Sequence, residues 1–139
     1  ADFAAISQVR PGEFYISSRD LADKNWLVAY MTDDGPIYYY SYNRESKNST
    51  FLFTNQPKLE GLQLASMQPV SYPARDGLTI HGYLTTPVNI PAQNLPTVML
   101  VHGGPWGRDS WGYDPEAQWL ANRGYAVLQV NFRGSTGYG

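Results

Sequence analysis

A short apolar run that ends in a glycine loop constrains this chain more than any other stretch. Residues 97–101 read Thr-Val-Met-Leu-Val, and His102-Gly103-Gly104-Pro105 follow directly. A continuous apolar run without polar alternation is typical of a strand buried on both faces, as in a parallel sheet. The two glycines allow a sharp turn and a close approach of the backbone to a ligand. We therefore expect free backbone N–H groups at the carboxyl end of a sheet, where open α/β sheets bind ligands.

A helix and a second buried strand are predicted after this loop. Asp114 and Pro115 are typical of an N-cap and a first helical residue, and Gly124 is typical of a left-handed helix stop. The apolar residues 126–130 then predict another buried strand. Before the glycine loop, residues 70–74 and 78–85 predict a β-hairpin that turns at Asp76-Gly77.

The first part of the chain, residues 1–66, is predicted to be β structure with a connector at 56–69 that has room for a short helix. Short turns rich in Asp, Asn and Gly separate four strand-like segments, which favours an antiparallel meander. Such a meander resembles one β-propeller blade or a piece of a sandwich. The run Tyr38-Tyr39-Tyr40 is expected to serve packing. The four segments are residues 14–17, 26–31, 37–42 and 50–54.

Composition excludes several classes of function. The net charge of −2 over 139 residues gives no reason to expect nucleic acid, and no apolar run approaches a membrane span. The glycines fit no nucleotide-binding pattern, and His81 and His102 have no carboxylate pattern that would make a metal site. We expect no cofactor. No targeting signal is visible, which leaves a cytoplasmic or a periplasmic location.

The predicted sheet is incomplete. Two parallel strands, one helix and a hairpin make half of a sheet whose faces both require cover. We therefore expect the chain to be a fragment of a longer protein.

Six motifs follow one another along the chain: Pro69–Tyr72, Asp76-Gly77, Ile80–Leu84, Val101–Pro105, Gly124–Leu128 and Asn131–Gly139. Together they resemble the prolyl oligopeptidase family of serine peptidases, in its acylaminoacyl-peptidase and dipeptidyl-peptidase-like branch. The resemblance implies an α/β fold: residues 67–139 form the N-terminal part of an α/β-hydrolase sheet, and residues 1–66 form the last β-propeller blade with its connector.

The family resemblance implies acyl transfer, which needs a nucleophile, a base, an acid and oxyanion donors. Ser110 and Ser135 lie in Arg-x-Ser-x-Gly contexts that do not match the Gly-x-Ser-x-Gly elbow. In α/β hydrolases the triad follows this region, so the Ser-Asp-His triad is absent from this chain. By resemblance, the Gly104 N–H is one oxyanion donor and Gly103 shapes its loop. The alternative is that the two glycines form only a tight turn.

Other residues near the predicted sheet edge have two interpretations each. His102 is expected to pack against its loop rather than act as a base, and His81 is expected at the surface or between domains. Arg133 and Tyr138 are candidate substrate-binding residues, with Arg133 alternatively pinning its loop to carbonyls or a carboxylate. Trp106 is a candidate substrate-binding residue too; Trp106 and Trp111 fit a subsite or an interdomain interface equally well.

The sequence therefore predicts part of a serine peptidase that cleaves short peptides through an acyl-enzyme, and that is inactive as this chain alone. Its partners are a short peptide and the remaining propeller and hydrolase segments, and a homo-oligomer stays open. Two alternatives remain: a non-catalytic β-rich binding module, and a fragment of an esterase or lipase.

Overall fold

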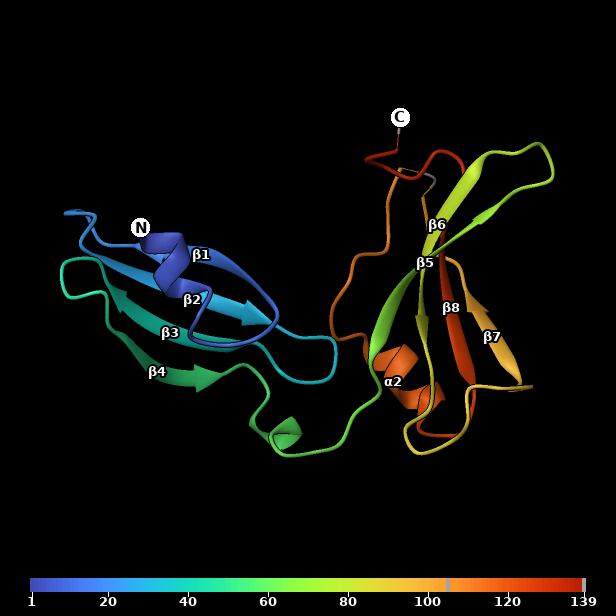
Figure 1. The fold of residues 1–139 in the computed structure, drawn as a ribbon, viewed down its shortest axis with the longest axis horizontal. Coiled ribbons are helices and arrows are strands. Elements are labelled where there is room, and N and C mark those ends of the chain that lie inside the picture. The colour runs from blue at the N-terminus through green and yellow to red at the C-terminus, as the bar shows by residue number, and fades with distance from the viewer. Residues whose placement is uncertain (105, 139) are drawn as a thin grey trace. The chain divides into compact units, whose positions relative to one another are not determined.

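The computed structural model describes residues 1–104 and 106–138. Pro105 and Gly139, which belong to the two glycine-containing motifs, lie outside the described residues. The chain divides into two compact units, Ala1–Leu62 and Gln63–Gly139, each of which is described by itself (Figure 1). Both units are built mainly on β-sheets, and helices are short.

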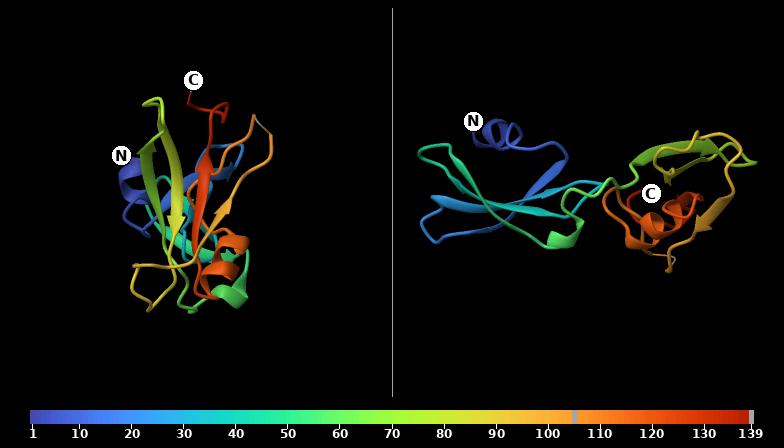
Figure 2. Two further views of the ribbon diagram at one scale, coloured as in Figure 1. Left: turned by 90° about the vertical axis from the view of Figure 1, so that its right-hand side faces the viewer. Right: turned by 90° about the horizontal axis from the view of Figure 1, so that it is seen from below.

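The first unit is a four-stranded antiparallel meander, as predicted. Its strands pair in the order of the sequence, β1-β2-β3-β4, and a short 3-10 helix (Pro57–Leu59) follows them. A helix, α1 (Asp2–Ile6), precedes the meander and lies against one face of it (Figures 1 and 2). The strands are β1 (Glu13–Arg19), β2 (Asn25–Met31), β3 (Tyr38–Asn43) and β4 (Ser49–Thr54).

Residues 1–66 were predicted to be β structure with room for a short helix only in the connector, so helix α1 is a correction to that prediction. A five-residue helix is too short to be stable by itself or to show a periodic pattern. Here Ile6 is fully buried in the aromatic core of the sheet, and the Tyr30 hydroxyl donates a hydrogen bond to the Ile6 carbonyl at 3.0 Å. Tertiary contacts, rather than local propensity, therefore hold this helix.

The other end of α1 is fixed by charge. Lys47 donates to the Asp2 carboxylate at 2.6 Å, and Tyr42 and Arg44 also donate to it. These bonds, with that from Lys47 the largest contribution, lower the pKa of Asp2 to about 2.

The tyrosine run in β3 packs against neighbouring side chains. Tyr39 stacks on Phe53 with ring centroids 4.8 Å apart, and Tyr40 meets Tyr30 edge-on at 5.3 Å. The Arg10 guanidinium lies 3.4 Å from the Tyr38 ring centroid. All three rings are therefore used in packing within the first unit.

The second unit contains a mixed four-stranded sheet of order β5-β6-β8-β7. Strands β7 and β8 are parallel, as predicted for a strand–helix–strand unit, whereas the β5–β6 and β6–β8 pairs are antiparallel. In the sequence, helix α2 lies between the two parallel strands. It contributes buried residues and covers one face of the sheet (Figure 2). The elements are β5 (Met67–Pro73), β6 (Thr79–Thr85), β7 (Thr97–Leu100), α2 (Pro115–Ala121) and β8 (Ala126–Asn131).

The hairpin turn and the start of helix α2 lie where the sequence predicts them. The β5–β6 hairpin turns at Asp76-Gly77, where Gly77 has a φ of +86° and its N–H donates to the Ala74 carbonyl at 2.9 Å. The Asp114 side chain caps α2 by accepting from the Ala117 N–H at 2.8 Å, and Pro115 is the first helical residue.

The burial of the parallel strands differs from the prediction. Strand β8 is buried along almost its whole length, whereas β7 lies at the edge of the sheet with Met99 58% exposed. The prediction that residues 97–101 are buried on both faces is wrong for this structure. An apolar run indicates a strand but cannot tell whether that strand is central or lies at an edge.

Helix α2 also anchors the start of the second unit. The buried Gln118 side chain donates to the Ala65 carbonyl at 2.7 Å and accepts from the Ala65 N–H at 2.9 Å. Within the described residues, no helix has the length and apolarity needed to cross a membrane. The same residues contain no cluster of three or more His, Cys, Asp or Glu side chains that could hold a metal ion.

Candidate functional site

Two loops meet beyond the carboxyl ends of the parallel strands. We call residues 102–109, which follow β7, the first loop, and residues 132–138, which follow β8, the second loop. Because the carboxyl ends of parallel strands lie at the same edge of a sheet, the topology brings these loops together. The first loop carries Gly103, Gly104 and Trp106, and the second carries Arg133 and Tyr138.

Backbone and side-chain hydrogen bonds join the two loops. The Thr136 N–H donates to the Gly107 carbonyl at 2.9 Å. Asn131, the last residue of β8, accepts from the Asp109 N–H at 2.8 Å and donates to the Asp109 carbonyl at 3.1 Å. Arg108 and Asn131 both donate to the Tyr138 hydroxyl, at 3.1 and 3.2 Å.

His102 lies at the centre of this junction. Its Nδ1 is 2.8 Å from the Gly103 carbonyl oxygen, and its Nε2 is 2.8 Å from the Ser135 hydroxyl. The ring also stacks on Phe132 of the second loop, with centroids 4.4 Å apart and planes 18° apart. The expected packing role therefore extends across both loops, because both ring nitrogens and one ring face are in use.

Neither serine of this region is arranged as a nucleophile. Ser135 is only 3% exposed, and its N–H closes a turn to the Phe132 carbonyl at 2.9 Å. The partner of His102 Nδ1 is a backbone carbonyl, whereas a triad histidine is oriented there by a carboxylate. Ser110 is exposed and has no hydrogen bond within the described part of the chain.

The two glycines of the first loop differ in their surroundings. Gly104 has a φ of +144°, and a Cβ built on it would lie 2.7 Å from the Trp106 nitrogen, so a side chain requires the loop to shift. A Cβ on Gly103 would meet nothing within 4 Å. Among the described residues, no hydrogen bond uses the Gly104 N–H. Of the two glycines, Gly104 is therefore the one whose position requires glycine.

The candidate substrate-binding side chains of the second loop have partners within the protein. Arg133 donates from one nitrogen to both carboxylate oxygens of Asp76, each at 2.5 Å. The Tyr138 ring stacks on His81 with centroids 5.0 Å apart, and the Arg108 guanidinium lies 4.9 Å from the same ring centroid. Arg133 thus holds the loop through a carboxylate, one of the two roles considered for it from the sequence.

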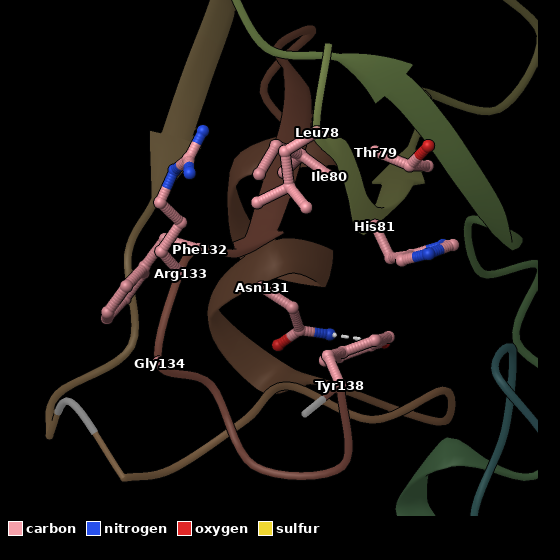
Figure 3. A pocket seen from close by; sticks show the side chains of 9 residues that line it. All are labelled: Leu78, Thr79, Ile80, His81, Asn131, Phe132, Arg133, Gly134 and Tyr138. Atoms are coloured by element: carbon pink, nitrogen blue, oxygen red, sulfur yellow. Dashed lines mark hydrogen bonds between the residues drawn. The ribbon is translucent and has the colours of Figure 1, made fainter. Parts of the chain in front are cut away.

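A pocket of about 230 Å³ lies between the second loop and the start of β6, and Figure 3 labels the residues that line it. Asn131 projects into it and bonds Tyr138, as the dashed line shows. Both groups best suited to anchor a polar ligand, Asn131 and Arg133, are already engaged by protein atoms.

The two tryptophans of the region behave differently. Trp106 is 85% exposed, whereas Trp111 is half-buried and its indole N–H donates to the Met67 carbonyl of β5 at 2.9 Å. Trp111 therefore fastens the segment before α2 to the sheet, and Trp106 presents its ring outward.

Sequence reasoning missed Asp109, Asn131 and the partner of His102. Burial raises the pKa of the Asp109 carboxyl, and the charge of Asp114 acts in the same direction, while His102 and Gln129 oppose the shift. Asp109 Oδ2 and Gln129 Oε1 are both buried and find no hydrogen-bond partner among the described residues. A polar residue at the end of a buried strand, such as Asn131, was the signal available in the sequence.

Comparisons with known proteins agree with the motifs. The profile of the prolyl oligopeptidase family matches residues 111–139. Dipeptidyl aminopeptidase BIII of Pseudoxanthomonas mexicana is 49% identical over 100% of this chain. The chain belongs to the prolyl oligopeptidase family.

Two further family members extend the comparison. Dipeptidyl peptidase family member 6 of Caenorhabditis elegans is 36% identical over 99% of this chain. The solved structure of Pyrococcus horikoshii acylaminoacyl peptidase aligns with 94% of this chain at a TM-score of 0.67 and 25% identity. The chain covers 21% of the Pseudoxanthomonas protein, 22% of the Caenorhabditis protein and 21% of the Pyrococcus structure. It therefore spans about a fifth of the length of the relatives it matches.

Proposed function

We propose that the whole protein to which this chain belongs is a serine peptidase that hydrolyses peptide bonds of short peptides through an acyl-enzyme. The observation that carries this proposal is the 49% identity, over the full length of this chain, to a protein named as a dipeptidyl aminopeptidase. The alignment spans both units.

The proposal assigns a role to each unit. Unit two is the N-terminal part of an α/β-hydrolase sheet, and its strand order β5-β6-β8-β7 with one parallel pair supports this assignment. Unit one is the last blade of a β-propeller, supported by its four-stranded antiparallel meander. The exposed edge strand β7 leaves room for a further parallel strand.

In this proposal the Gly104 N–H is one donor of the oxyanion hole. The nucleophile, the acid and the base belong to segments outside these residues. The support is geometric: Gly104 lies beyond the carboxyl end of a parallel strand, its backbone takes a glycine conformation, and its amide has no partner in the described chain. Loss of one such donor typically lowers the rate by about 10²–10³.

Of the three candidate substrate-binding residues, Trp106 suits contact with a peptide best. Its ring is 85% exposed and is free to cover an apolar side chain. For Arg133 and Tyr138, substrate contact stays a prediction; their bonds to Asp76, Arg108 and Asn131 support a role in shaping the loop.

A fluorophosphonate probe tests the proposal, because it labels activated serines. We expect the whole protein to be labelled and this chain alone to stay unlabelled. Dipeptidyl, N-acetylaminoacyl and short ester substrates, each with the same chromogenic leaving group, then separate the peptidase from an esterase. A whole protein that is not labelled and cleaves none of these substrates contradicts the proposal and favours a non-catalytic binding module.

A further inference from the structure

We propose that His102 and Ser135 form a clasp that sets the direction of the Gly104 amide. This inference rests on the proposed function in one respect, namely that the Gly104 N–H is an oxyanion donor. The clasp itself consists of two hydrogen bonds, Ser135 Oγ to His102 Nε2 and His102 Nδ1 to the Gly103 carbonyl oxygen, each 2.8 Å long.

The connection from the ring to the amide runs through one rigid group. The carbonyl of Gly103 and the N–H of Gly104 belong to the same peptide unit, which is planar and, like the other described peptides, trans. In a trans peptide the C=O and N–H bonds point in opposite directions. A hydrogen bond that fixes the Gly103 oxygen therefore fixes the direction of the Gly104 N–H as well.

The protonation of the ring follows from its partners. A backbone carbonyl can only accept, so His102 Nδ1 carries the hydrogen and donates it to Gly103. In a neutral ring, Nε2 is then an acceptor, and the hydroxyl of Ser135 donates to it. The Gly103 carbonyl thereby selects the tautomer, and the Ser135 hydroxyl, which can donate or accept, matches it by donating to Nε2.

The clasp joins a buried serine to a half-buried, stacked ring. Ser135 is 3% exposed, and the imidazole stacks on Phe132 with centroids 4.4 Å apart. On the other side of the loop, a Cβ on Gly107 would lie 3.0 Å from the Gly103 oxygen and 3.5 Å from His102 Nδ1. The ring therefore has little freedom to rotate, and the hydrogen bond from Nδ1 is what holds the exposed peptide plane.

The same geometry assigns His102 and Ser135 as positioning residues rather than as a base and a nucleophile. The distance between Nε2 and Oγ would suit a catalytic pair, but the serine is buried and the second ring nitrogen is bonded to a carbonyl. The bond between the two residues serves to hold the loops that follow β7 and β8.

Four variants of the whole protein test the clasp, with kcat and KM measured separately. Ser135→Ala and His102→Asn each remove the Ser135 bond, since an Asn amide reaches the position of Nδ1 but not of Nε2. His102→Gln reaches the position of Nε2 and loses the Gly103 bond, and His102→Phe loses both bonds while it keeps the stack on Phe132. Ser110→Ala, a change of the exposed serine nearby, is the matched control.

We expect kcat to fall about tenfold in Ser135→Ala and His102→Asn, and more in His102→Gln and His102→Phe, with KM little changed, since part of an oxyanion donor's contribution is lost. The double variant Ser135→Ala/His102→Asn should be no slower than either single variant, because both remove one bond. A fall in thermal stability with unchanged kcat, or an additive double variant, overturns the inference.

Two further measurements separate failure of the clasp from failure of the proposed function. Imidazole ¹⁵N shifts of His102 in the unsubstituted protein should show the Nδ1–H tautomer, and Ser135→Ala should change them whether or not the protein is a peptidase. A ring with its hydrogen on Nε2 overturns the clasp. Fluorophosphonate labelling of Ser135 also overturns it, since it makes that residue the nucleophile.

Discussion

One nitrogen of the Arg133 guanidinium lies 2.5 Å from both carboxylate oxygens of Asp76, although the two residues are 57 positions apart. This pair joins the turn of the β5–β6 hairpin to the second loop. Both side chains are more than half exposed, at 55% and 58%, so water and salt weaken their attraction. The pair therefore guides the position of the loop more than it stabilises the fold.

Replacement of Arg133 by Gln should cause a small loss of thermal stability that disappears at high salt, because screening already weakens an exposed pair. The Arg133 hydrogen bond lowers the pKa of Asp76. The stabilisation that the pair gives to the folded state is therefore present above the ordinary pKa of the carboxyl and is lost as the pH falls through the lowered pKa. Thermal unfolding at two salt concentrations and several acidic pH values measures both effects. Arg75→Gln is the control, since Arg75 is exposed and has no ion pair within the described residues. A large loss that salt does not change contradicts this account.

Gly104→Ala should lower kcat of the whole protein by about 10²–10³ and also lower the melting temperature, because the new Cβ strains the backbone and displaces the loop that carries the amide. That Cβ would lie 2.7 Å from the Trp106 nitrogen. Gly103→Ala is the matched control, since its Cβ meets nothing within 4 Å, and its kinetics should stay close to those of the unsubstituted protein. Equal effects of the two substitutions would show that the loop, rather than the Gly104 position, is sensitive.

Asp109→Asn should stabilise the second unit at neutral pH. Burial raises the pKa of Asp109, so the folded state favours the protonated carboxyl. The contribution of Asp109 to the free energy of unfolding is therefore complete below its ordinary pKa and is lost as the pH rises through the raised pKa. An amide has no charge to bury and offers a donor to the unpaired Gln129 Oε1.

The gain in the free energy of unfolding from Asp109→Asn should consequently grow as the pH rises from the ordinary to the raised pKa of Asp109, and should then stay constant. Denaturation at a series of pH values between 3 and 8 gives this profile (about the range over which carboxyl groups titrate). The exposed Asp34→Asn serves as the control and should show no such trend. A gain that is the same at every pH would exclude the carboxyl charge as its cause.

Ile6→Ala should destabilise the first unit by about 2–5 kcal/mol, because it removes a fully buried side chain and leaves a cavity in the aromatic core. Trp26 is the only tryptophan of residues 1–62 and lies in that core, so its fluorescence reports the unfolding of this unit. Leu21→Ala is the control, since Leu21 is fully exposed, and it should leave the unfolding free energy unchanged. An Ile6 variant as stable as the control would mean that α1 does not contribute to the core.

The elements that local chemistry determines were predicted well. Asp76-Gly77 specifies a hairpin turn, and Asp114-Pro115 specifies a helix start, because each acts through its own backbone and the next few residues. Helix α1 was missed because its support comes from Tyr30 and Lys47, which lie 24 and 45 residues away from their partners in the helix.

The position of β7 shows a different limit. Its apolar residues predict a strand, but whether it is central depends on which strands pair on either side, and the run itself contains no such information. In the candidate site, too, local features were predictable and long-range contacts were not. The glycine pair predicts a tight loop, and Gly104 has the backbone conformation that requires glycine. The bond from His102 to Ser135 joins two loops across 33 residues and has no periodic or local signal.

That bond also has an evolutionary consequence. Loss of His102 leaves the hydroxyl of the buried Ser135 unpaired, and loss of Ser135 leaves Nε2 of the half-buried His102 unpaired, so a single loss costs more than loss of both together. A lineage that changes position 102 is therefore under selection to change position 135 as well, and intermediates with a single change should be rare. The two positions should covary among related chains and be inherited as a pair.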